Sequence, residues 1–183
     1  MSKKIIFKDI KIIKLIEHED SRGFFKEVYN KELLVKYNIL ADFVQDNESH
    51  SLKKNTLRGL HFQLIPYDQS KLIRVVSGEI YDVFIDLRKN SPSYLSYDFY
   101  KLTPESGILF IPSGFAHGFL TLSDNTIVNY KVDKHYNKDL ELGIRWDDPL
   151  FQINWPINSN QMLISKKDYE LPFWNEIESK VTF

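Results

Sequence analysis

Apolar residues in this chain recur in short runs and in alternation, a pattern that predicts strands rather than helices. The clearest case is the segment 80–87, whose residues alternate between two sets that are both rich in apolar side chains. A strand of this kind is expected to lie between two layers of the core. One set is Tyr81, Val83, Ile85 and Leu87, and the other is Ile80, Asp82, Phe84 and Asp86.

Similar short segments follow one another along the chain, separated by turns rich in Gly, Pro, Ser and Asn, which is typical of a β-sandwich or barrel. Helices are predicted only over 31–38, with Asn30 as N-cap, and in the tail after Ser165, where Pro172 limits their length. We therefore expect one mostly-β domain over residues 1–183 with a short helical tail. The other predicted strands cover 4–17, 24–29, 42–45, 56–63, 71–78, 95–102, 107–112, 118–122 and 126–132.

The composition is that of a globular protein, and it excludes several kinds of chemistry. The 183 residues include no cysteine, which rules out disulfides, thiolate metal sites and thiol nucleophiles. The net charge of −1 argues against binding to nucleic acid or to an anionic membrane surface. No apolar run approaches the length of a membrane span, and the first one is too short for a signal-peptide core. We expect a cytoplasmic protein.

The octapeptide "TLRGLHFQ", residues 56–63, raises the question of what His61 does between Leu60 and Phe62. The apolar pattern alone favours a structural histidine in the core. A metal ligand is the weaker alternative, because the chain has no His-x-His pair and His50 is eleven residues away. The third possibility is a general base at the mouth of a pocket.

Two further segments could carry chemistry, and each also has an ordinary structural explanation. Gly114 and Gly118 lie on either side of His117 and would let a ligand approach it, but the segment also fits a plain hairpin turn. Tyr130 has polar neighbours and could act as an acid, although aromatic residues in strands mostly belong to the core.

Arg22 precedes Gly23 and two phenylalanines, which suits a phosphate and a planar base as well as it suits a tight turn. Ser165 and Asp168 form an S-x-x-D pattern, and this spacing favours a helix cap. The sequence contains no G-x-S-x-G, P-loop or G-x-G-x-x-G motif. It therefore does not support a serine hydrolase, an NTPase or a Rossmann dehydrogenase.

A series of sequence blocks occurs in order over most of the chain, from about residue 7 to residue 170. The blocks are "DSRGFF", "FVQDN", "LRGLHFQ", "KLIRVVSGEIYDVFIDLRKNSPSY", "LFIPSGFAHGF", "NYK", "RWDDP" and "ISKKD". Together they resemble the dTDP-4-dehydrorhamnose 3,5-epimerase family. The resemblance implies a cupin-type jelly-roll barrel, usually a homodimer, that acts on a nucleotide-diphosphate 4-keto sugar without a metal or another cofactor.

The reaction implied by this resemblance is an epimerisation beside a ketone. The C4 ketone of a nucleotide-linked 6-deoxy sugar acidifies the C–H bonds at C3 and C5. One proton is removed there and another is returned on the opposite face. This chemistry requires a base, an acid across the ring, and a cation or hydrogen-bond donor for the enolate oxygen.

The resemblance assigns these roles to four residues. His61 matches the base, and Asp168 matches the acidic partner that fixes the tautomer of this histidine. Tyr130 matches the phenol that supplies a proton on the opposite face. Lys71 matches the cation near the C4 oxygen, where a positive charge favours the enolate.

Substrate-binding positions follow from the same resemblance. His117 matches a second active-site histidine that is expected to contact the sugar or its oxyanion, and Asp82 could orient one of its neighbours. In a β-dimer, some of the binding groups could reach into the site of the partner subunit. The other positions implied to bind substrate are Arg22, Phe25, Glu27, Gln45, Asp46, Asn47, Arg58, Tyr136, Glu141 and Lys167.

Three segments depart from the pattern of the family: the one after "VQDN", then 63–71 and 132–137. They surround the expected pocket, so they leave open the nucleotide (dTDP, GDP or CDP), the sugar (hexose or 6-deoxy-heptose) and a C3-only reaction. The expected role is to supply a precursor of a surface polysaccharide, such as lipopolysaccharide or capsule. A non-catalytic cupin that binds a nucleotide sugar and a metal-dependent cupin are the alternatives from other classes.

Overall fold

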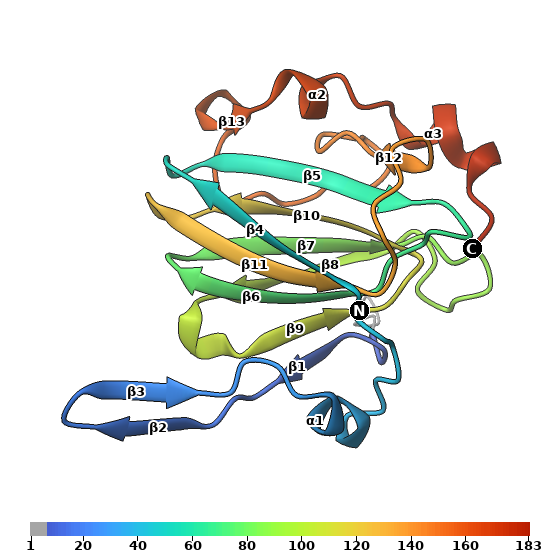
Figure 1. Ribbon diagram of the computed structural model, residues 1–183. Helices are drawn as coiled ribbons and strands as arrows, with labels where there is room; N and C mark the ends of the chain where they lie inside the picture. The colour runs from blue at the N-terminus through green and yellow to red at the C-terminus, as the bar shows by residue number, and fades with distance from the viewer. Residues whose placement is uncertain (1–6) are drawn as a thin grey trace, which may run out of the picture.

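Two antiparallel sheets stacked face to face form the body of the protein in the computed structural model, which describes residues 7–183 (Figure 1). The first sheet has the strand order β1-β9-β6-β11-β4, and the second has the order β12-β5-β10-β7-β8 with β13 paired in parallel to β5. Successive strands such as β4, β5, β6 and β7 alternate between the sheets, as in a jelly roll. The predicted mostly-β fold with short peripheral helices is confirmed.

The strands and helices are short, and most connections between them are turns. The strands of the first sheet are β1 (Lys11–Ile13), β4 (Gln45–Ser51), β6 (Lys71–Ser77), β9 (Ile108–Ile111) and β11 (Thr126–Val132). Those of the second are β5 (Thr56–Gln63), β7 (Ile80–Asp86), β8 (Tyr97–Leu102), β10 (Phe115–Thr121), β12 (Glu141–Gly143) and β13 (Leu163–Ile164). The helices are α1 (Lys31–Lys36), α2 (Lys166–Tyr169) and α3 (Trp174–Ile177), with 3-10 turns at Pro104–Ser106, Ser159–Gln161 and Glu178–Lys180.

Strand β7 lies between two hydrophobic clusters, as its alternation predicts. Tyr81, Val83 and Ile85 belong to the cluster on the outer side of the second sheet. Ile80 and Phe84 belong to the cluster between the sheets. All residues of β7 are buried, so each face of this strand stabilises a different layer.

Strand β4 is the main strand that the hydrophobic pattern missed. The prediction placed a strand over 42–45, whereas the strand begins at Gln45 and runs to Ser51. Its sequence, QDNESHS, contains no apolar residue, so it carries no alternation signal. It is held as an edge strand by pairing with β11 along its whole length.

The N-terminal apolar run does not form one long strand. Residues 4–6 of the predicted strand 4–17 lie outside the described part of the chain, and only Lys11–Ile13 pair with the barrel. Glu17 then begins a hairpin, β2 (Glu17–Asp20) and β3 (Gly23–Lys26), that projects away from the barrel (Figure 1). The predicted helix after it is present, and Asn30 caps it by accepting hydrogen bonds from two backbone N–H groups.

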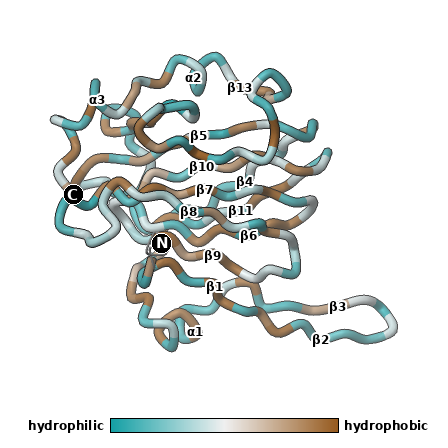
Figure 2. Tube along the Cα trace, turned by 180° about the vertical axis from the view of Figure 1, so that it is seen from behind, coloured by the Kyte–Doolittle hydropathy of each residue, from teal (hydrophilic) through white to brown (hydrophobic). Residues whose placement is uncertain are grey.

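The C-terminal segment covers the outer face of the second sheet. Trp146, Phe151, Trp174, Ile177 and Val181 are buried in the outer cluster with residues of β5, β7 and β10. Figure 2 shows hydrophobic stretches both along the stacked strands and in this covering segment. Among residues 7–183, no helix is long and apolar enough to cross a membrane.

Candidate active site

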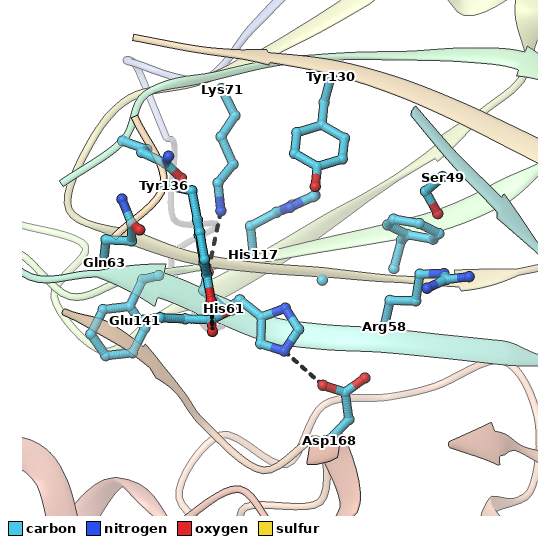
Figure 3. Close-up of a pocket in the computed structure, with 14 residues that line it drawn as sticks. Ser49, Arg58, His61, Gln63, Lys71, His117, Tyr130, Tyr136, Glu141 and Asp168 are labelled. Atoms are coloured by element: carbon cyan, nitrogen blue, oxygen red, sulfur yellow. Dashed lines mark hydrogen bonds and ion pairs between the residues drawn. The ribbon is translucent and has the colours of Figure 1, made fainter. Parts of the chain in front are cut away.

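A cavity of about 300 Å³ opens between the two sheets, and it brings together all four predicted catalytic residues. His61 comes from β5, Lys71 from β6, Tyr130 from β11 and Asp168 from α2 (Figure 3). Four of the predicted substrate-binding residues also line the cavity. These are Arg58, His117, Tyr136 and Glu141.

A β-bulge explains why Arg58 and His61 reach the same cavity. Residues three apart on a regular strand point to opposite faces. Here the pairing with β10 runs from His117 opposite His61 to Phe119 opposite Arg58, so β5 has one more residue than its partner. The bulge contains Gly59 at φ +106°, and a Cβ there would lie 2.7 Å from the Cα of Gly118. Glycine is required at this close approach, and the bulge re-aims the side chain beyond it.

His61 forms a short hydrogen bond with Asp168, since His61 Nε2 and Asp168 Oδ1 lie 2.6 Å apart. Asp168 is buried. Burial acts to raise the pKa of Asp168, but hydrogen bonds from His61 and Ser165 and one from the Gly59 backbone outweigh it and lower the pKa. Asp168 is therefore a carboxylate, and it leaves the second ring nitrogen of His61 facing the cavity (Figure 3).

The helix-cap prediction for Ser165 and the partner prediction for Asp168 are compatible. Ser165 Oγ accepts a hydrogen bond from the backbone N–H of Asp168 at 3.1 Å. This cap uses the backbone N–H of Asp168, and the carboxylate of the same residue still pairs with His61. Local structure and the site thus depend on different atoms of the same residue.

His117 forms a second histidine–carboxylate pair on the neighbouring strand. His117 Nε2 and Asp82 Oδ2 lie 2.8 Å apart, and Asp82 is fully buried. Burial lowers the pKa of His117, against an opposing effect of Asp82. Burial likewise raises the pKa of Asp82, although His117 and Lys71 oppose this. The pair supports the earlier suggestion that Asp82 orients a neighbour, and that neighbour is His117.

Lys71 is a buried amine at the side of the cavity, and its Nζ donates to the backbone oxygen of His61 at 3.3 Å. Burial lowers the pKa of Lys71 to about 8, while Asp82 and Glu141 counteract part of this effect. The amine is consequently still mostly protonated at neutral pH.

Tyr130 extends into the cavity from the first sheet, opposite His61 (Figure 3). Burial raises the pKa of its phenol, although the charge of Arg58 acts in the other direction. The hydroxyl therefore keeps its proton at neutral pH and can donate it.

Polar residues at the rim hold an exposed aromatic ring. Tyr136 is 52% exposed, and its hydroxyl donates to Glu141 Oε2 at 2.9 Å. Lys167 Nζ donates to the same oxygen at 2.6 Å. The side-chain oxygen of Gln45 accepts the backbone N–H of Tyr136 at 3.0 Å. Lys167 and Gln45 thus support the rim without lining the cavity.

The remaining predicted binding residues lie elsewhere in this chain. Arg22 and Phe25 are on the projecting hairpin, Glu27 follows it, and the Arg22 guanidinium forms an ion pair with Asp20. Asp46 and Asn47 are on β4, where Asp46 forms an ion pair with Lys131. Their assignment to substrate binding stays a prediction.

Sequence reasoning missed several residues that line the cavity, among them Ser49, Gln63 and Phe119. Gln63 had a usable signal, because it lies two residues after His61 on the same face of β5. Its buried side chain accepts the backbone N–H of Asn137 at 2.6 Å, and so supports the loop that carries Tyr136. Ser49 had none, because strand β4 itself was not predicted.

The cavity holds a histidine paired with a carboxylate, a buried amine and a protonated phenol. These groups can act as base, cation and acid in proton transfer to and from carbon. Within residues 7–183, no group of three or more His, Cys, Asp or Glu side chains is arranged to hold a metal ion. The fold and site thus define an acid–base site of the isomerase type.

Comparisons with known proteins identify the family. The sequence profile of the dTDP-4-dehydrorhamnose 3,5-epimerase family matches residues 4–176. A protein of that name from Methanothermobacter thermautotrophicus is 47% identical over 153 residues, which cover 82% of each chain. A crystal structure of dTDP-4-dehydrorhamnose 3,5-epimerase from Bacillus anthracis, with TDP and pyrophosphate bound, is 45% identical. It covers 93% of this chain and 97% of its own, with a TM-score of 0.88.

A second similar structure is the dTDP-6-deoxy-D-glucose-3,5-epimerase of Legionella pneumophila in complex with dTDP-4-keto-L-rhamnose. It is 37% identical, covers 96% of this chain and 94% of its own, and has a TM-score of 0.88. The chain belongs to the dTDP-4-dehydrorhamnose 3,5-epimerase family. The cupin-type fold and the epimerase activity predicted from the sequence are confirmed, and the non-catalytic alternative is not favoured.

Proposed function

We propose that this protein inverts C3 and C5 of dTDP-4-keto-6-deoxyglucose to give dTDP-4-keto-rhamnose, a precursor of a surface polysaccharide. Family membership and the names of the relatives support this substrate. The observation that carries the mechanism is that His61 and Tyr130 face each other across one cavity from opposite sheets (Figure 3). A cytoplasmic location belongs to the same proposal.

In the proposed first step, His61 removes the proton from the sugar carbon next to the C4 ketone. Its Nε2 is engaged with Asp168 at 2.6 Å, so the other ring nitrogen presents its lone pair to the cavity. The Asp168 carboxylate then stabilises the imidazolium that forms. The side chain of His61 is 31% exposed, which allows the base to exchange its proton with water before the next turnover.

The electron pair released from carbon moves onto the C4 oxygen, and the enolate needs positive charge beside it. Lys71 supplies this charge as an ammonium group, and His117, fixed by Asp82, lines the cavity beside it. Lys71 is held in place before substrate arrives, so its stabilisation of the enolate requires little reorganisation.

In the proposed second step, Tyr130 returns a proton to the opposite face of the sugar. Its raised pKa keeps the phenol protonated until the carbanion accepts the proton. The nucleotide would lie toward the rim, where the exposed ring of Tyr136 can stack on a base and Arg58 can bind a diphosphate.

A homodimer is part of the proposal. The projecting hairpin exposes Phe24 (64% exposed) and Phe25 (70% exposed), which a monomer would leave in water. We infer that the hairpin of one subunit brings Arg22, Phe25 and Glu27 to the rim of its partner's cavity. Light scattering should then give twice the mass of the chain, and Arg22→Ala should raise KM more than it lowers kcat.

Hydrogen exchange in heavy water tests the reaction directly. When the enzyme is mixed with dTDP-4-keto-6-deoxyglucose in D2O, NMR should show deuterium at both C3 and C5. GDP- and CDP-linked 4-keto sugars serve as the comparison panel. If neither C3 nor C5 exchanges in any of these substrates, the epimerase assignment is contradicted. If only C3 exchanges, the assignment is restricted to a C3 epimerase.

Two variants separate the proposed steps. His61→Asn should abolish exchange, because no base remains to remove the proton. Tyr130→Phe should retain slow exchange but lose inversion, because His61 can still return the proton to the face from which it came. Equal loss of exchange in both variants would contradict the proposal that His61 removes the proton and Tyr130 returns it.

A further inference from the structure

The "RWDDP" motif, residues 145–149, has no role in the proposed mechanism. Its side chains and backbone contact the residues that directly follow Asp168. The Arg145 guanidinium lies 5.1 Å from the ring centroid of Tyr169 and 4.9 Å from that of Phe173. The backbone N–H of Arg145 donates to the carbonyl oxygen of Pro172 at 3.0 Å. Arg145 thus contacts the last residue of α2 and two residues of the segment that follows it.

Ion pairing and burial hold Arg145 in this position. Its Nε and Nη2 donate to the two carboxylate oxygens of Asp147, each at 2.9 Å. The Arg145 side chain is only 24% exposed. A bidentate carboxylate contact fixes the plane of a guanidinium, and a fixed plane suits stacking between two rings.

Asp148 forms a second contact with the same segment, through hydrogen bonds to the backbone. One of its oxygens accepts the backbone N–H of Trp174 at 2.6 Å, and the other accepts that of Leu150 at 2.9 Å. Asp148 and Trp174 are both buried. A buried carboxylate that accepts backbone N–H groups with both oxygens is a rigid anchor.

The motif is joined directly to the strand that carries His61. Ile144 and Leu60 exchange two backbone hydrogen bonds, at 2.9 and 3.3 Å, and Gly143 is the pairing partner of His61. A Cβ at Gly143 would lie 2.7 Å from both Leu171 Cδ2 and the Leu60 carbonyl oxygen. The chain from 143 to 148 therefore connects β5 on one side to residues 169–174 on the other (Figure 1).

Asp168 lies on a helix of only four residues. A helix this short has little stability of its own. Upstream, the chain is held by the two-residue pairing of β13 with β5. Downstream, it is held by the contacts of Arg145 and Asp148.

We propose that Arg145 and Asp148 are positioning residues that hold the Asp168 carboxylate against His61. This inference rests on the proposed role of the His61–Asp168 pair. Neither residue lines the cavity, so their effect on catalysis is transmitted through the position of Asp168.

Arg145→Met tests the proposal, because methionine keeps apolar bulk but loses the planar cation and its ion pair. A small displacement of a catalytic group can cost up to about a hundredfold in rate, and we expect kcat to fall about tenfold. KM should change less than twofold, because Arg145 does not reach the cavity.

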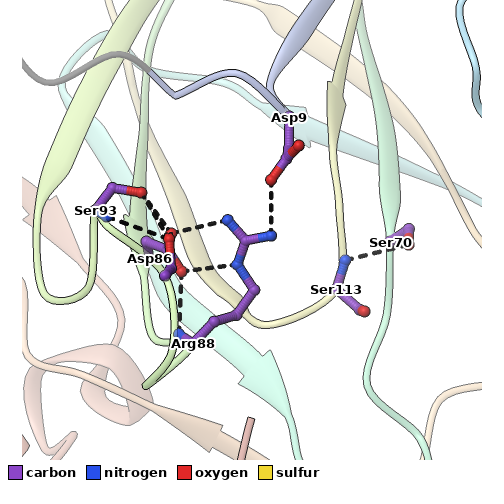
Figure 4. A network of polar contacts seen from close by, with 7 residues as sticks. Asp9, Ser70, Asp86, Arg88, Ser93 and Ser113 are labelled. Carbon is purple, nitrogen blue, oxygen red and sulfur yellow. Dashed lines mark hydrogen bonds and ion pairs between the residues drawn. The ribbon is translucent and has the colours of Figure 1, made fainter.

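Arg88→Met is the matched control. Arg88 also stacks on an aromatic ring, with its guanidinium 4.6 Å from the centroid of Phe115, and also pairs with a carboxylate, Asp86. It contacts Asp9 as well, in a network that includes no residue of the cavity (Figure 4). Both variants should lower the melting temperature, but only Arg145→Met should lower kcat.

A double-mutant cycle separates positioning from general destabilisation. In an Asp168→Ala background, Arg145→Met should still lower the melting temperature but should cause no further loss of exchange rate. A full tenfold loss in that background would overturn the proposal. If Asp168→Ala alone leaves the rate unchanged, the proposed mechanism fails instead, so the two failures are distinguishable.

NMR of the His61 ring gives a readout that does not depend on turnover. The Nε2 proton shared with Asp168 should resonate far downfield in the wild type, and it should weaken or shift in Arg145→Met but not in Arg88→Met. If Arg145→Met does not fold, Arg145→Lys enters the same cycle with an expected loss of about threefold, because lysine keeps the charge without the planar stack. An unchanged His61 signal together with an unchanged kcat would overturn the proposal.

Discussion

Two histidine–carboxylate pairs contribute their histidines to the cavity from adjacent strands, and the pairs differ in burial. His61 and His117 are directly paired across β5 and β10. The His61 side chain is 31% exposed and its partner comes from the C-terminal segment. The His117 side chain is 11% exposed, and its partner Asp82 is completely buried in β7.

The two environments shift the carboxyl groups in opposite directions. The pKa of Asp168 is lowered because hydrogen bonds outweigh its burial, whereas burial raises the pKa of Asp82. A pair with a stable carboxylate can accept an imidazolium, and a pair that resists charge holds a neutral ring in place. The same two residue types therefore suit a base in one position and a fixed hydrogen-bonding group in the other.

Replacing each histidine by asparagine should show the largest difference between the pairs. General base catalysis contributes about 10² to 10⁴ in rate, so His61→Asn should lower kcat by about 10³ or more. His117→Asn removes a ring expected to contact and orient the sugar and should lower kcat by about ten- to a hundredfold. Stopped-flow or NMR assays of both variants provide the test, and equal losses would mean that the pairs do not differ in role.

Asp82→Asn should reveal the electrostatic connection between the buried pair and Lys71. Lys71 is charged below its pKa of about 8, so activity should decline as the pH rises through that value. Asp82 supports the charged form of Lys71, so its neutral replacement should move the alkaline limb of the pH–rate profile to lower pH. Asp168→Asn lowers the rate without this movement. If the alkaline limb of the pH–rate profile does not move in Asp82→Asn, the charge of Asp82 does not control the pKa of Lys71.

The buried pair was easier to place from sequence than the exposed one. Alternation in 80–87 put Asp82 on the face shared with Phe84, and the structure has that face between the sheets. Asp168 is 107 residues from His61, and its local pattern indicated only a helix cap. The family resemblance was needed to connect the two, because hydrophobic periodicity describes local elements and not the contacts between distant ones.

Other features needed geometry that periodicity does not describe. Arg58 and His61 share a cavity only because of the bulge at Gly59, which breaks the period of two. Strand β4 has no apolar residue and is formed by its pairing with β11. Arg22 and Phe25 lie on a hairpin outside the barrel, and their proposed binding role depends on the proposed second subunit, which periodicity within one chain does not describe.

Lys71→Met should show that the buried charge of Lys71 serves catalysis but lowers the free energy of unfolding. The folded-state pKa of about 8 lies below the ordinary value of 10.5, so below pH 8 the folded protein bears the full cost of burying the charge. This cost disappears as the pH rises from 8 to 10.5. The variant should be inactive, yet at pH 7 its free energy of unfolding should rise by on the order of 1–3 kcal/mol. Urea unfolding at pH 7 and 10.5 checks both values, and a less stable variant at pH 7 would contradict the argument.

The smallest effect, and the sharpest test of the comparison, is the sign of the stability change when each carboxylate becomes an amide. Asp168 has a lowered pKa in the folded state, so its charge stabilises the fold above the ordinary carboxyl pKa of about 4, and this contribution is lost as the pH falls through the folded value. Asp82 has a raised pKa in the folded state, so the tendency of its carboxyl group to ionise opposes folding over the same neutral range.

At pH 7, Asp168→Asn should therefore lower the free energy of unfolding and Asp82→Asn should raise it, each by on the order of 1 kcal/mol. Both differences should shrink as the pH falls below about 4, where the carboxyl groups of the wild type become protonated as well. Urea unfolding of the three proteins at pH 7 and pH 3.5 measures these signs. Equal signs at pH 7 would show that burial does not set the two pairs apart.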